Sequence, residues 1–321
     1  MTKLPNFFVV GAVKAGTTSL YYYFKQHPEI YMSPIKEPHY FSKDIDINSF
    51  REDYKKIAII NIQKYFSQPK LTELQVAFIR DFEHYKQLFR EVKNEKAIGE
   101  ISNSYLYSKV AAQEIRKTIP DAKIIMILRD PVERAFSHYL MNLRDGLTSE
   151  TDFVSEVIND FKKNPKGWGI SHLYIELGLY YNQVKRYLET FPEKNVKIIL
   201  YDDYKENPLK TLNEIWDFLE VSKDVEPDMS KRYNTAAIPK YPRLNTIARK
   251  FYTILTPILP LDTREKMKNY YKKITMKPEK RKLLDSERRI LLEYFEEDIK
   301  KLSKLINRDL SNWLKTEYNQ K

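Results

Sequence analysis

The sequence predicts an α/β protein, with a central parallel sheet flanked by helices and a helical C-terminal extension. Over residues 1–226, short apolar runs alternate with segments of helical periodicity, as in parallel sheets covered on both faces. After residue 226 only helical patterns recur. We expect a single domain over residues 1–321, made of an α/β core (1–226) and a basic, mostly helical extension (227–321) that packs on the core.

The predicted strands are short, wholly apolar or β-branched runs that end at glycine, proline or polar residues. The clearest is 123–128, which stops at Arg129, Asp130 and Pro131, where a proline suits the first turn of the next helix. The predicted strands cover 7–10, 30–32, 97–99, 123–128 and 196–201.

Helical periodicity recurs between these strands and again near the C-terminus. Residues 44–95 are expected to be mostly helical, 33–41 to form a loop, and 227–260, with five prolines, to form an extended, partly irregular wrap. The other predicted helices cover 17 to about 28, 109–119, 131–144, 151–163, 179–190, 208–220, 263–275 and 286–306.

The composition excludes several classes of protein. The 321-residue chain is 42% hydrophobic and has no cysteine, which excludes disulfide scaffolds, thiolate zinc sites and cysteine nucleophiles. No run approaches the roughly 18 apolar residues of a membrane span. A strand is predicted within a few residues of Met1, so we expect no signal peptide and a cytoplasmic protein.

The net charge of +11 is concentrated at the C-terminal end. Residues 227–321 contain 23 Lys/Arg against 12 Asp/Glu, which equals the excess of the whole chain. This pattern is typical of nucleic-acid binding, of attraction for an anionic cosubstrate or membrane, or of a solvated helical surface. Residues 247–261 are apolar with basic flanks, so membrane contact is an alternative to packing across the sheet; we expect packing, and no nucleic-acid partner.

The turn after the first strand has the features of a phosphate-binding loop. Gly11 and Gly16 let the backbone curl so that N–H groups point inward at a helix N-terminus. Their spacing fits G-x-x-x-x-G-K-[ST], but Thr17 stands where a nucleotide triphosphatase has its lysine, and Lys14 lies three positions earlier. A nucleotide triphosphatase also needs an acidic residue that holds a metal ion, but here the strand 123–128 is followed by Arg129, and an acid, Asp130, comes only after it. The loop therefore suits a 5′-phosphate that carries a transferable group and binds without a metal.

Two strings together resemble the sulfotransferases that use 3′-phosphoadenosine-5′-phosphosulfate (PAPS). Residues 11–20, GAVKAGTTSL, resemble the family's 5′-phosphosulfate loop, and residues 128–139, LRDPVERAFSHY, resemble its 3′-phosphate segment. Residues 33–41 resemble the loop after the second strand in bacterial and heparan-type members, and residues 295–313 resemble the C-terminal end of bacterial members. The resemblance implies a P-loop-like three-layer fold and a metal-independent, in-line sulfuryl transfer that leaves 3′-phosphoadenosine-5′-phosphate (PAP).

The resemblance also implies roles for individual residues. The loop residues are expected to hold the 5′-phosphate, Lys14 to meet charge on the bridging oxygen, and Arg129 with Ser137 to hold the 3′-phosphate. Independently, a guanidinium at the carboxyl end of a central strand can grip a phosphate through two N–H bonds. The loop residues expected to bind the cosubstrate are Lys14, Ala15, Gly16, Thr17, Thr18 and Ser19.

A base must take the acceptor's proton, and two candidates lie in the loop of residues 33–41. Glu37 matches the catalytic glutamate of heparan-type members, and His39 is the rival because histidine titrates near neutrality. Lys14 and Lys36 would lower the carboxylate pKa and weaken Glu37 as a base. Lys240, or Arg243 in its place, is expected to close over the nucleotide, as a basic residue does in bacterial members.

The acceptor is expected to be a small molecule, lipid or carbohydrate bearing a hydroxyl or amine. Ile101 stands where heparan sulfotransferases carry a lysine, which argues against heparan-like recognition there. The alternatives are a P-loop kinase or NTPase with Mg-dependent turnover, and a protein that binds nucleic acid or anionic surfaces with steep salt dependence.

Overall fold

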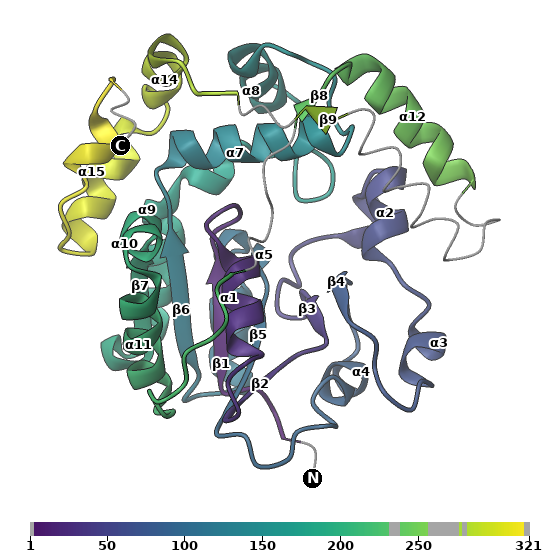
Figure 1. Cartoon of the computed structure of the whole chain (residues 1–321), viewed down its shortest axis with the longest axis vertical. Coiled ribbons are helices and arrows are strands. Elements are labelled where there is room, and N and C mark those ends of the chain that lie inside the picture. Colours follow the sequence, from purple (N-terminus) through teal and green to yellow (C-terminus); the bar gives the residue numbers. More distant parts are fainter. Residues whose placement is uncertain (1–2, 231–237, 256–275, 278–280, 318–321) are drawn as a thin grey trace.

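The computed structural model describes residues 3–230, 238–255, 276–277 and 281–317 (Figure 1). The predicted helix 263–275 lies outside the described residues. The predicted parallel sheet is confirmed: five strands lie in the order β2-β5-β1-β6-β7, and every neighbouring pair runs parallel. The strands of this sheet are β1 Phe7–Gly11, β2 Ile30–Met32, β5 Ala97–Ile101, β6 Lys123–Leu128 and β7 Val196–Leu200.

Both faces of the sheet are covered because β1 is apolar on both sides. Phe7 meets Phe24 of the first helix, whereas its neighbour Phe8 points to the opposite face and meets Tyr105. Every residue of β1 is buried, as a strand between two helical layers requires. The helices are α1 Thr17–Phe24, α2 Glu52–Ala58, α3 Ile62–Phe66, α4 Phe82–Gln87, α5 Ser104–Tyr107, α6 Ala111–Thr118, α7 Pro131–Arg144, α8 Phe153–Phe161, α9 Tyr180–Thr190, α10 Tyr201–Glu206, α11 Pro208–Leu219, α12 Pro242–Leu255, α14 Asp285–Leu292 and α15 Glu296–Leu305.

Helix α7 lies across the carboxyl ends of the strands in Figure 1 and begins sharply for two reasons. Pro131 occupies its first turn, and the Asp130 side chain accepts hydrogen bonds from the N–H groups of Val132 and Glu133. The strand-to-helix turn therefore fixes the residue just before it, Arg129, at the sheet edge where open α/β folds bind ligands.

Three expectations about secondary structure were wrong. Part of the expected loop 33–41 is strand β3 (Ile35–Glu37), which pairs with β4 (Leu74–Val76) inside the segment expected to be mostly helical. Only short helices form there, α2, α3 and α4. Within the expected irregular wrap, helix α12 begins at Pro242, after β8 (Ile238–Pro239), which pairs with β9 (Met276–Lys277). Pro242 serves as a helix start rather than a helix breaker.

The C-terminal helices contact the core at the first turns of α7 and α9. Arg288 on α14 forms a buried ion pair with Asp130, with Nη2 and Oδ2 2.6 Å apart. On α15, Asp298 accepts from the N–H of Tyr181 at the start of α9, at 3.2 and 3.1 Å. Among the helices of the described ranges, none is long and apolar enough to cross a membrane.

Candidate active site

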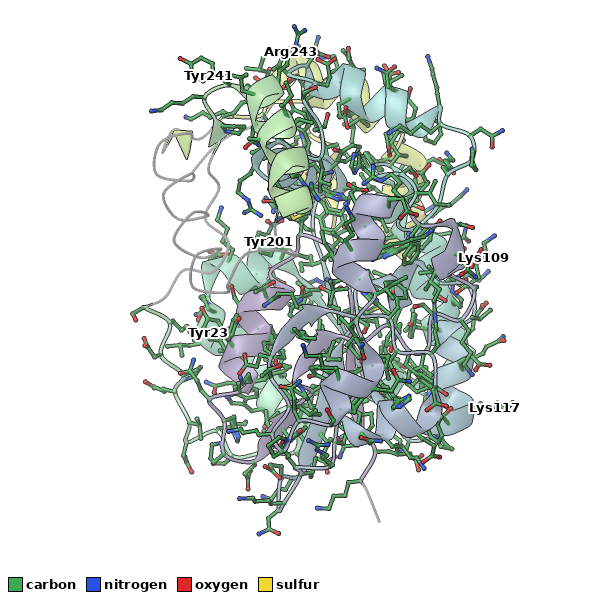
Figure 2. All side chains as sticks on the ribbon, turned by 90° about the vertical axis from the view of Figure 1, so that its right-hand side faces the viewer. Tyr23, Lys109, Lys117, Tyr201, Tyr241 and Arg243 are labelled. Atoms are coloured by element: carbon green, nitrogen blue, oxygen red, sulfur yellow. The ribbon has the colours of Figure 1, made fainter. Side chains whose placement is uncertain are left out.

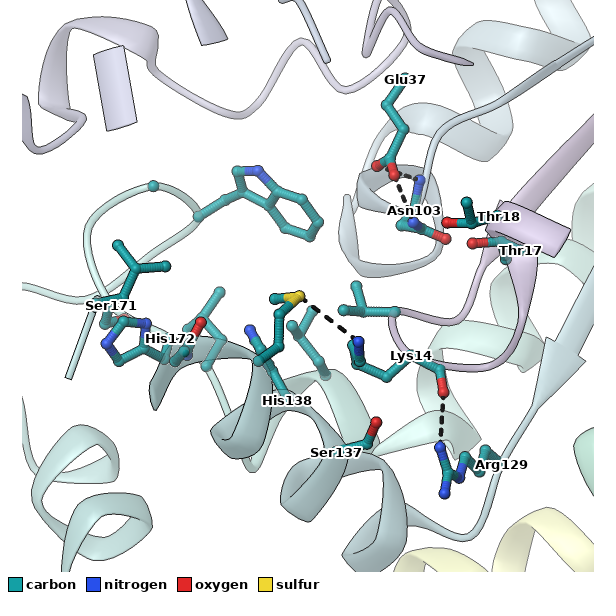
Figure 3. A pocket seen from close by; sticks show the side chains of 18 of the residues that line it. Lys14, Thr17, Thr18, Glu37, Asn103, Arg129, Ser137, His138, Ser171 and His172 are labelled. Carbon is teal, nitrogen blue, oxygen red and sulfur yellow. Dashed lines mark hydrogen bonds between the residues drawn. The ribbon is translucent and has the colours of Figure 1, made fainter. Parts of the chain in front are cut away.

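A polar cavity of about 360 Å³ opens at the carboxyl ends of the strands (Figure 3). Its walls come from the β1–α1 loop, from β3, from the β5–α5 junction, from α7 and from the segment around residues 168–173. Most of the predicted site residues meet here. Those that line the cavity are Lys14, Gly16, Thr17, Thr18, Ser19, Glu37, Arg129 and Ser137.

The β1–α1 loop needs glycine at both of its predicted positions. Gly16 caps α1 with φ +85, and a Cβ there would lie 3.0 Å from the Tyr204 ring. At Gly11 a Cβ would lie 2.9 Å from Leu106. The first N–H groups of α1 have no intrahelical acceptor, and Thr17 and Thr18 of this first turn line the cavity, so this helix start is able to bind an anion.

Ala15 differs from the rest of the predicted loop. It is fully buried, does not line the cavity, and its N–H donates to the carbonyl of Ala12 at 3.2 Å. Its small side chain packs inside the loop, so its contribution is to the loop's shape.

Lys14 extends into the cavity from a residue with φ +67, and its Nζ lies 3.6 Å from the sulfur of Met141. Burial, reinforced by the positive charges of Arg144 and Arg129, lowers the pKa of Lys14 to about 8. An anion placed beside this ammonium would reverse the penalty, so the site favours a negatively charged ligand.

Arg129 lines the cavity and connects the β1–α1 loop with the first turn of α7. Its Nη1 donates to the Lys14 carbonyl at 3.1 Å, its Nη2 pairs with Glu133 at 3.0 Å, and its guanidinium lies 4.6 Å from the Tyr201 ring centroid. Its Nε is buried without a hydrogen-bond partner. Ser137 lies two turns along α7 and lines the same end of the cavity (Figure 3).

Asp130, which was weighed in the sequence as a metal-holding acid, is committed to structural contacts. Oδ1 accepts from two backbone N–H groups and from Arg288 Nη1 at 3.1 Å, and Oδ2 accepts from Arg288 Nη2. Over the described ranges, no group of three or more His, Asp or Glu residues is arranged to hold a metal ion.

Glu37 at the end of β3 presents a carboxylate to the cavity. Oε1 accepts from Lys36 Nζ at 2.7 Å and from Asn103 Nδ2 at 2.8 Å. Burial alone would raise the pKa of Glu37, but the positive charge of Lys36, the hydrogen bond from Lys36 and a backbone hydrogen bond from Asn103 lower this pKa below its ordinary value. Glu37 is therefore ionised at neutral pH and held in one orientation.

His39 lies behind Glu37 and does not line the cavity. The ring is fully buried and stacks on Phe78 with centroids 4.3 Å apart, while Nδ1 lies 2.6 Å from Ser104 Oγ. Its Nε2 has no hydrogen-bond partner and lies 3.6 Å from Glu37 Oε2. Burial lowers the pKa of His39 to about 4, so the ring is neutral at physiological pH.

Lys240 does not line this cavity; it is exposed between β8 and α12. Residues 231–237, which precede it, lie outside the described residues. The position of Lys240 gives no support to the expectation that it binds the nucleotide, which stays a prediction.

Several cavity residues were not identified as site residues from the sequence. Asn103 follows Ile101, the position compared above with the heparan sulfotransferases. Its hydrogen bond to Glu37 joins residues 66 positions apart, so no local sequence pattern indicates it. His138 lies next to Ser137, and its Nδ1 is buried without a partner. Figure 3 shows Ser171 and His172 at the end away from Arg129. The other lining residues in contact with this segment are Trp168, which donates to Tyr54, and Arg51, whose N–H donates to the Gly169 carbonyl; none belongs to a recognisable motif.

Comparisons with known proteins agree with this geometry. A family model described as the sulfotransferase domain matches residues 4–302. The crystal structure of a sulfotransferase from Alicyclobacillus acidocaldarius is 30% identical, with a TM-score of 0.66 over 98% of this chain and 100% of that chain. Carbohydrate sulfotransferase 15 of Mus musculus is 25% identical over 300 residues, covering 78% of this chain and 51% of that protein.

The Homo sapiens bifunctional heparan sulfate N-deacetylase/N-sulfotransferase 3 is 27% identical over 224 residues, covering 68% of this chain and 22% of that protein. The chain thus spans about half the length, or less, of these curated relatives. The resemblance predicted from the loop after β1 and the segment after β6 is confirmed, as is the fold class. The chain belongs to the sulfotransferase domain family.

Proposed function

We propose that this protein transfers a sulfuryl group from PAPS to a hydroxyl or amine of an acceptor. The observation that carries the proposal is the arrangement of one cavity: a phosphate loop and a buried guanidinium flank its cosubstrate end, with Lys14 beside them and Glu37 facing it. Both phosphate-bearing positions of PAPS have a matching cation or helix N-terminus.

The reaction is an in-line displacement at sulfur. The acceptor oxygen or nitrogen forms a bond to sulfur, the bond from sulfur to the 5′-phosphate oxygen breaks, and PAP leaves. Lys14, as an ammonium, stabilises the negative charge on the leaving oxygen, and the Thr17 and Thr18 hydroxyls with the first N–H groups of α1 hold the 5′-phosphate. Ser19 lines the same end of the cavity.

Glu37 is the proposed base because it is ionised and faces the cavity, whereas His39 does not. A carboxylate with a lowered pKa is a weak base for an alcohol, so proton transfer must accompany attack at sulfur rather than precede it. The unpaired Nε2 of His39, 3.6 Å from Glu37, can support the orientation of the carboxylate once it carries the proton.

The acceptor is proposed to occupy the end of the cavity lined by Trp168 and Tyr54. The Trp168 indole N–H donates to the Tyr54 hydroxyl at 2.9 Å, which fixes both aromatic side chains against the space. An indole face beside hydroxyl and imidazole groups suits a sugar ring, and the names of the curated relatives point the same way. A small molecule or a lipid with a polar head remains within the proposal.

The kinase alternative is disfavoured by two residues. Thr17 stands where P-loop kinases have the lysine that binds the phosphates. The Asp130 carboxylate pairs with Arg288, so it is not available to hold a metal ion. The single-domain organisation, the cytoplasmic location and the absence of a nucleic-acid partner stay predictions.

The test is a thermal-shift comparison of PAP, AMP and Mg-ATP with the full chain. We expect PAP to stabilise the protein most and EDTA to leave that shift, and sulfuryl transfer from PAPS, unchanged. A larger shift with Mg-ATP than with PAP, removed by EDTA, contradicts the proposal in favour of a kinase.

A further inference from the structure

Helix α12 is attached to the rest of the protein by its polar side. The Asn245 amide is buried and donates to the carbonyls of Leu143 and Arg144 at 2.8 and 3.1 Å. Arg249 donates to the Asp145 carbonyl at 2.9 Å and faces Asp53 at 3.8 Å. These contacts occupy one side of the helix, at the C-terminal end of α7.

The opposite side of the helix is apolar and faces outward. Leu244 is 61% exposed and Ile247 50%, and the two lie three residues apart on one side of the helix. Tyr241, which directly precedes the helix, is 66% exposed. Lys240 and Arg243, both exposed, border this stripe. Figure 2 shows Tyr241 and Arg243 at the outer edge of the molecule, at the start of α12. We call Lys240, Tyr241, Arg243, Leu244 and Ile247 the outer face of α12.

Over residues 242–249, α12 therefore differs from an ordinary surface helix, which buries its apolar side chains against the core and exposes its polar ones. Leaving Leu and Ile in water has a cost that an external apolar partner removes. The charge of this part of the sequence indicates which partner. Residues 240–277 contain ten Lys/Arg and two Asp/Glu, and residues 251–261 read FYTILTPILPL.

We propose that the outer face of α12 docks on an anionic lipid bilayer. Apolar side chains at the centre of the face enter the boundary between headgroups and acyl chains, and the bordering cations meet the negative surface potential. Either signal alone gives weak membrane binding, and the two occur together here. The expectation that 247–261 packs across the sheet does not hold for Ile247; residues 256–261 lie outside the described residues.

Other occupants fit the face less well. A second copy of the chain would bring Lys240 and Arg243 against the same cations, because the first acidic residue after position 240 is Asp262. A nucleic acid offers phosphates to the cations but no apolar partner for Leu244 and Ile247 at the centre.

The bilayer would lie on the acceptor side of the molecule. Asn245 and Arg249 hold α12 to residues 143–145, directly before Leu147, which lines the cavity, and Arg249 faces Asp53, two residues from the cavity-lining Arg51. An acceptor at a membrane surface would be presented to that end. Bilayer docking itself requires no particular acceptor and no nucleotide.

The test is co-sedimentation of the full chain with vesicles of phosphatidylcholine alone or with about 30% phosphatidylserine. We expect binding to the anionic vesicles that weakens with salt, and little to the neutral ones. The variant L244E/I247E should lose at least about tenfold in partition coefficient, because two carboxylates replace the inserting side chains. L209E/I290E, which places the same charges at other exposed positions, should bind like the parent chain.

Folding of each variant is checked by its thermal shift with PAP, and L244S/I247S replaces the glutamate variant if the latter does not fold. Three results would overturn the proposal. The first is no binding to anionic vesicles; the second is unchanged binding by both variants of Leu244 and Ile247. The third is a concentration-dependent dimer, or an RNA complex, that depends on these residues while vesicles do not bind. The vesicle readout is independent of PAP binding, so it can fail while the proposed sulfuryl transfer stands.

Discussion

Replacing Arg129 by alanine tests the assignment of the 3′-phosphate site. The guanidinium donates one bond to the Lys14 carbonyl and one to Glu133, and its buried Nε has no partner. Nε and the remaining Nη hydrogens are left for a ligand. Two charge-assisted bonds to a phosphate contribute about 1.5–3 kcal/mol each, so PAP affinity should fall by roughly 10²- to 10⁴-fold.

The loss for AMP should be much smaller because AMP has no 3′-phosphate. The Arg129→Ala change still removes the bond to the Lys14 carbonyl, a neutral acceptor, which contributes about 0.5–1.5 kcal/mol to the shape of the loop. AMP affinity should therefore fall by about tenfold at most. The difference between the two nucleotides, rather than either loss alone, is the diagnostic quantity.

The assay is isothermal titration calorimetry with PAP and with AMP, on parent, Arg129→Ala and Arg144→Ala proteins. Arg144 is the matched control, because it adds positive charge near Lys14 but pairs with Asp145 and does not line the cavity. Its loss should weaken both nucleotides slightly and equally. If Arg129→Ala weakens PAP and AMP by the same factor, the 3′-phosphate assignment is wrong.

Three further predictions test the base, the cation and the attachment of α14. Glu37→Gln should lower kcat by about 10²- to 10⁴-fold with PAP affinity preserved; near-normal transfer from labelled PAPS would move the base to His39. With a pKa of about 8, Lys14 is mostly neutral at pH ~8.5 in the free protein, and a bound anion raises that pKa, so PAP binding should take up a proton there. Calorimetry in two buffers of different ionisation enthalpy measures this uptake; if Lys14→Met shows the same uptake, the group is misassigned. Arg288→Met leaves Asp130 buried and unpaired, so the free energy of unfolding in urea should fall by about 3–5 kcal/mol, and a change under about 1 kcal/mol would contradict this.

The parts of the site that depend on local geometry were predictable from the sequence. Gly16 is required because the residue has a positive φ and aromatic rings on top of it, and such constraints act on single positions. Arg129 was predictable because the apolar run of β6 is long enough to show where the strand ends. A buried strand and the turn after it therefore indicate the end of the cavity where we propose that the cosubstrate binds.

The remaining parts depend on contacts between distant segments. Asn103 holds Glu37 across 66 positions, and Arg288 reaches Asp130 across 158. Neither pairing follows from local periodicity or spacing. β3 and β4 have three residues each, too short for an alternating pattern, and the acceptor end is built from loops whose residues have no common signature.

The prediction of α12 was wrong because proline was interpreted only as a breaker. Pro239 and Pro242 mark the irregular entry to the helix, whereas the stretch after Pro242 has ordinary helical periodicity. The exposed stripe at its start could not be distinguished from a buried one, because periodicity does not show which side of a helix faces the core.

The ion pair between Asp130 and Arg288 has a consequence for how the polypeptide can be shortened. Asp130, the carboxylate at the start of α7, pairs with Arg288 on the C-terminal helix α14. Phe295, which follows α14, lies so close to Gly178 that a Cβ there would be 2.8 Å from its ring. A fragment that ends before Asp285 would retain the two cosubstrate motifs, 11–20 and 128–139, but would leave the Asp130 carboxylate without the cation that pairs with it. We expect such a truncation to misfold rather than yield a minimal enzyme, so the two ends of the chain should unfold in one cooperative transition.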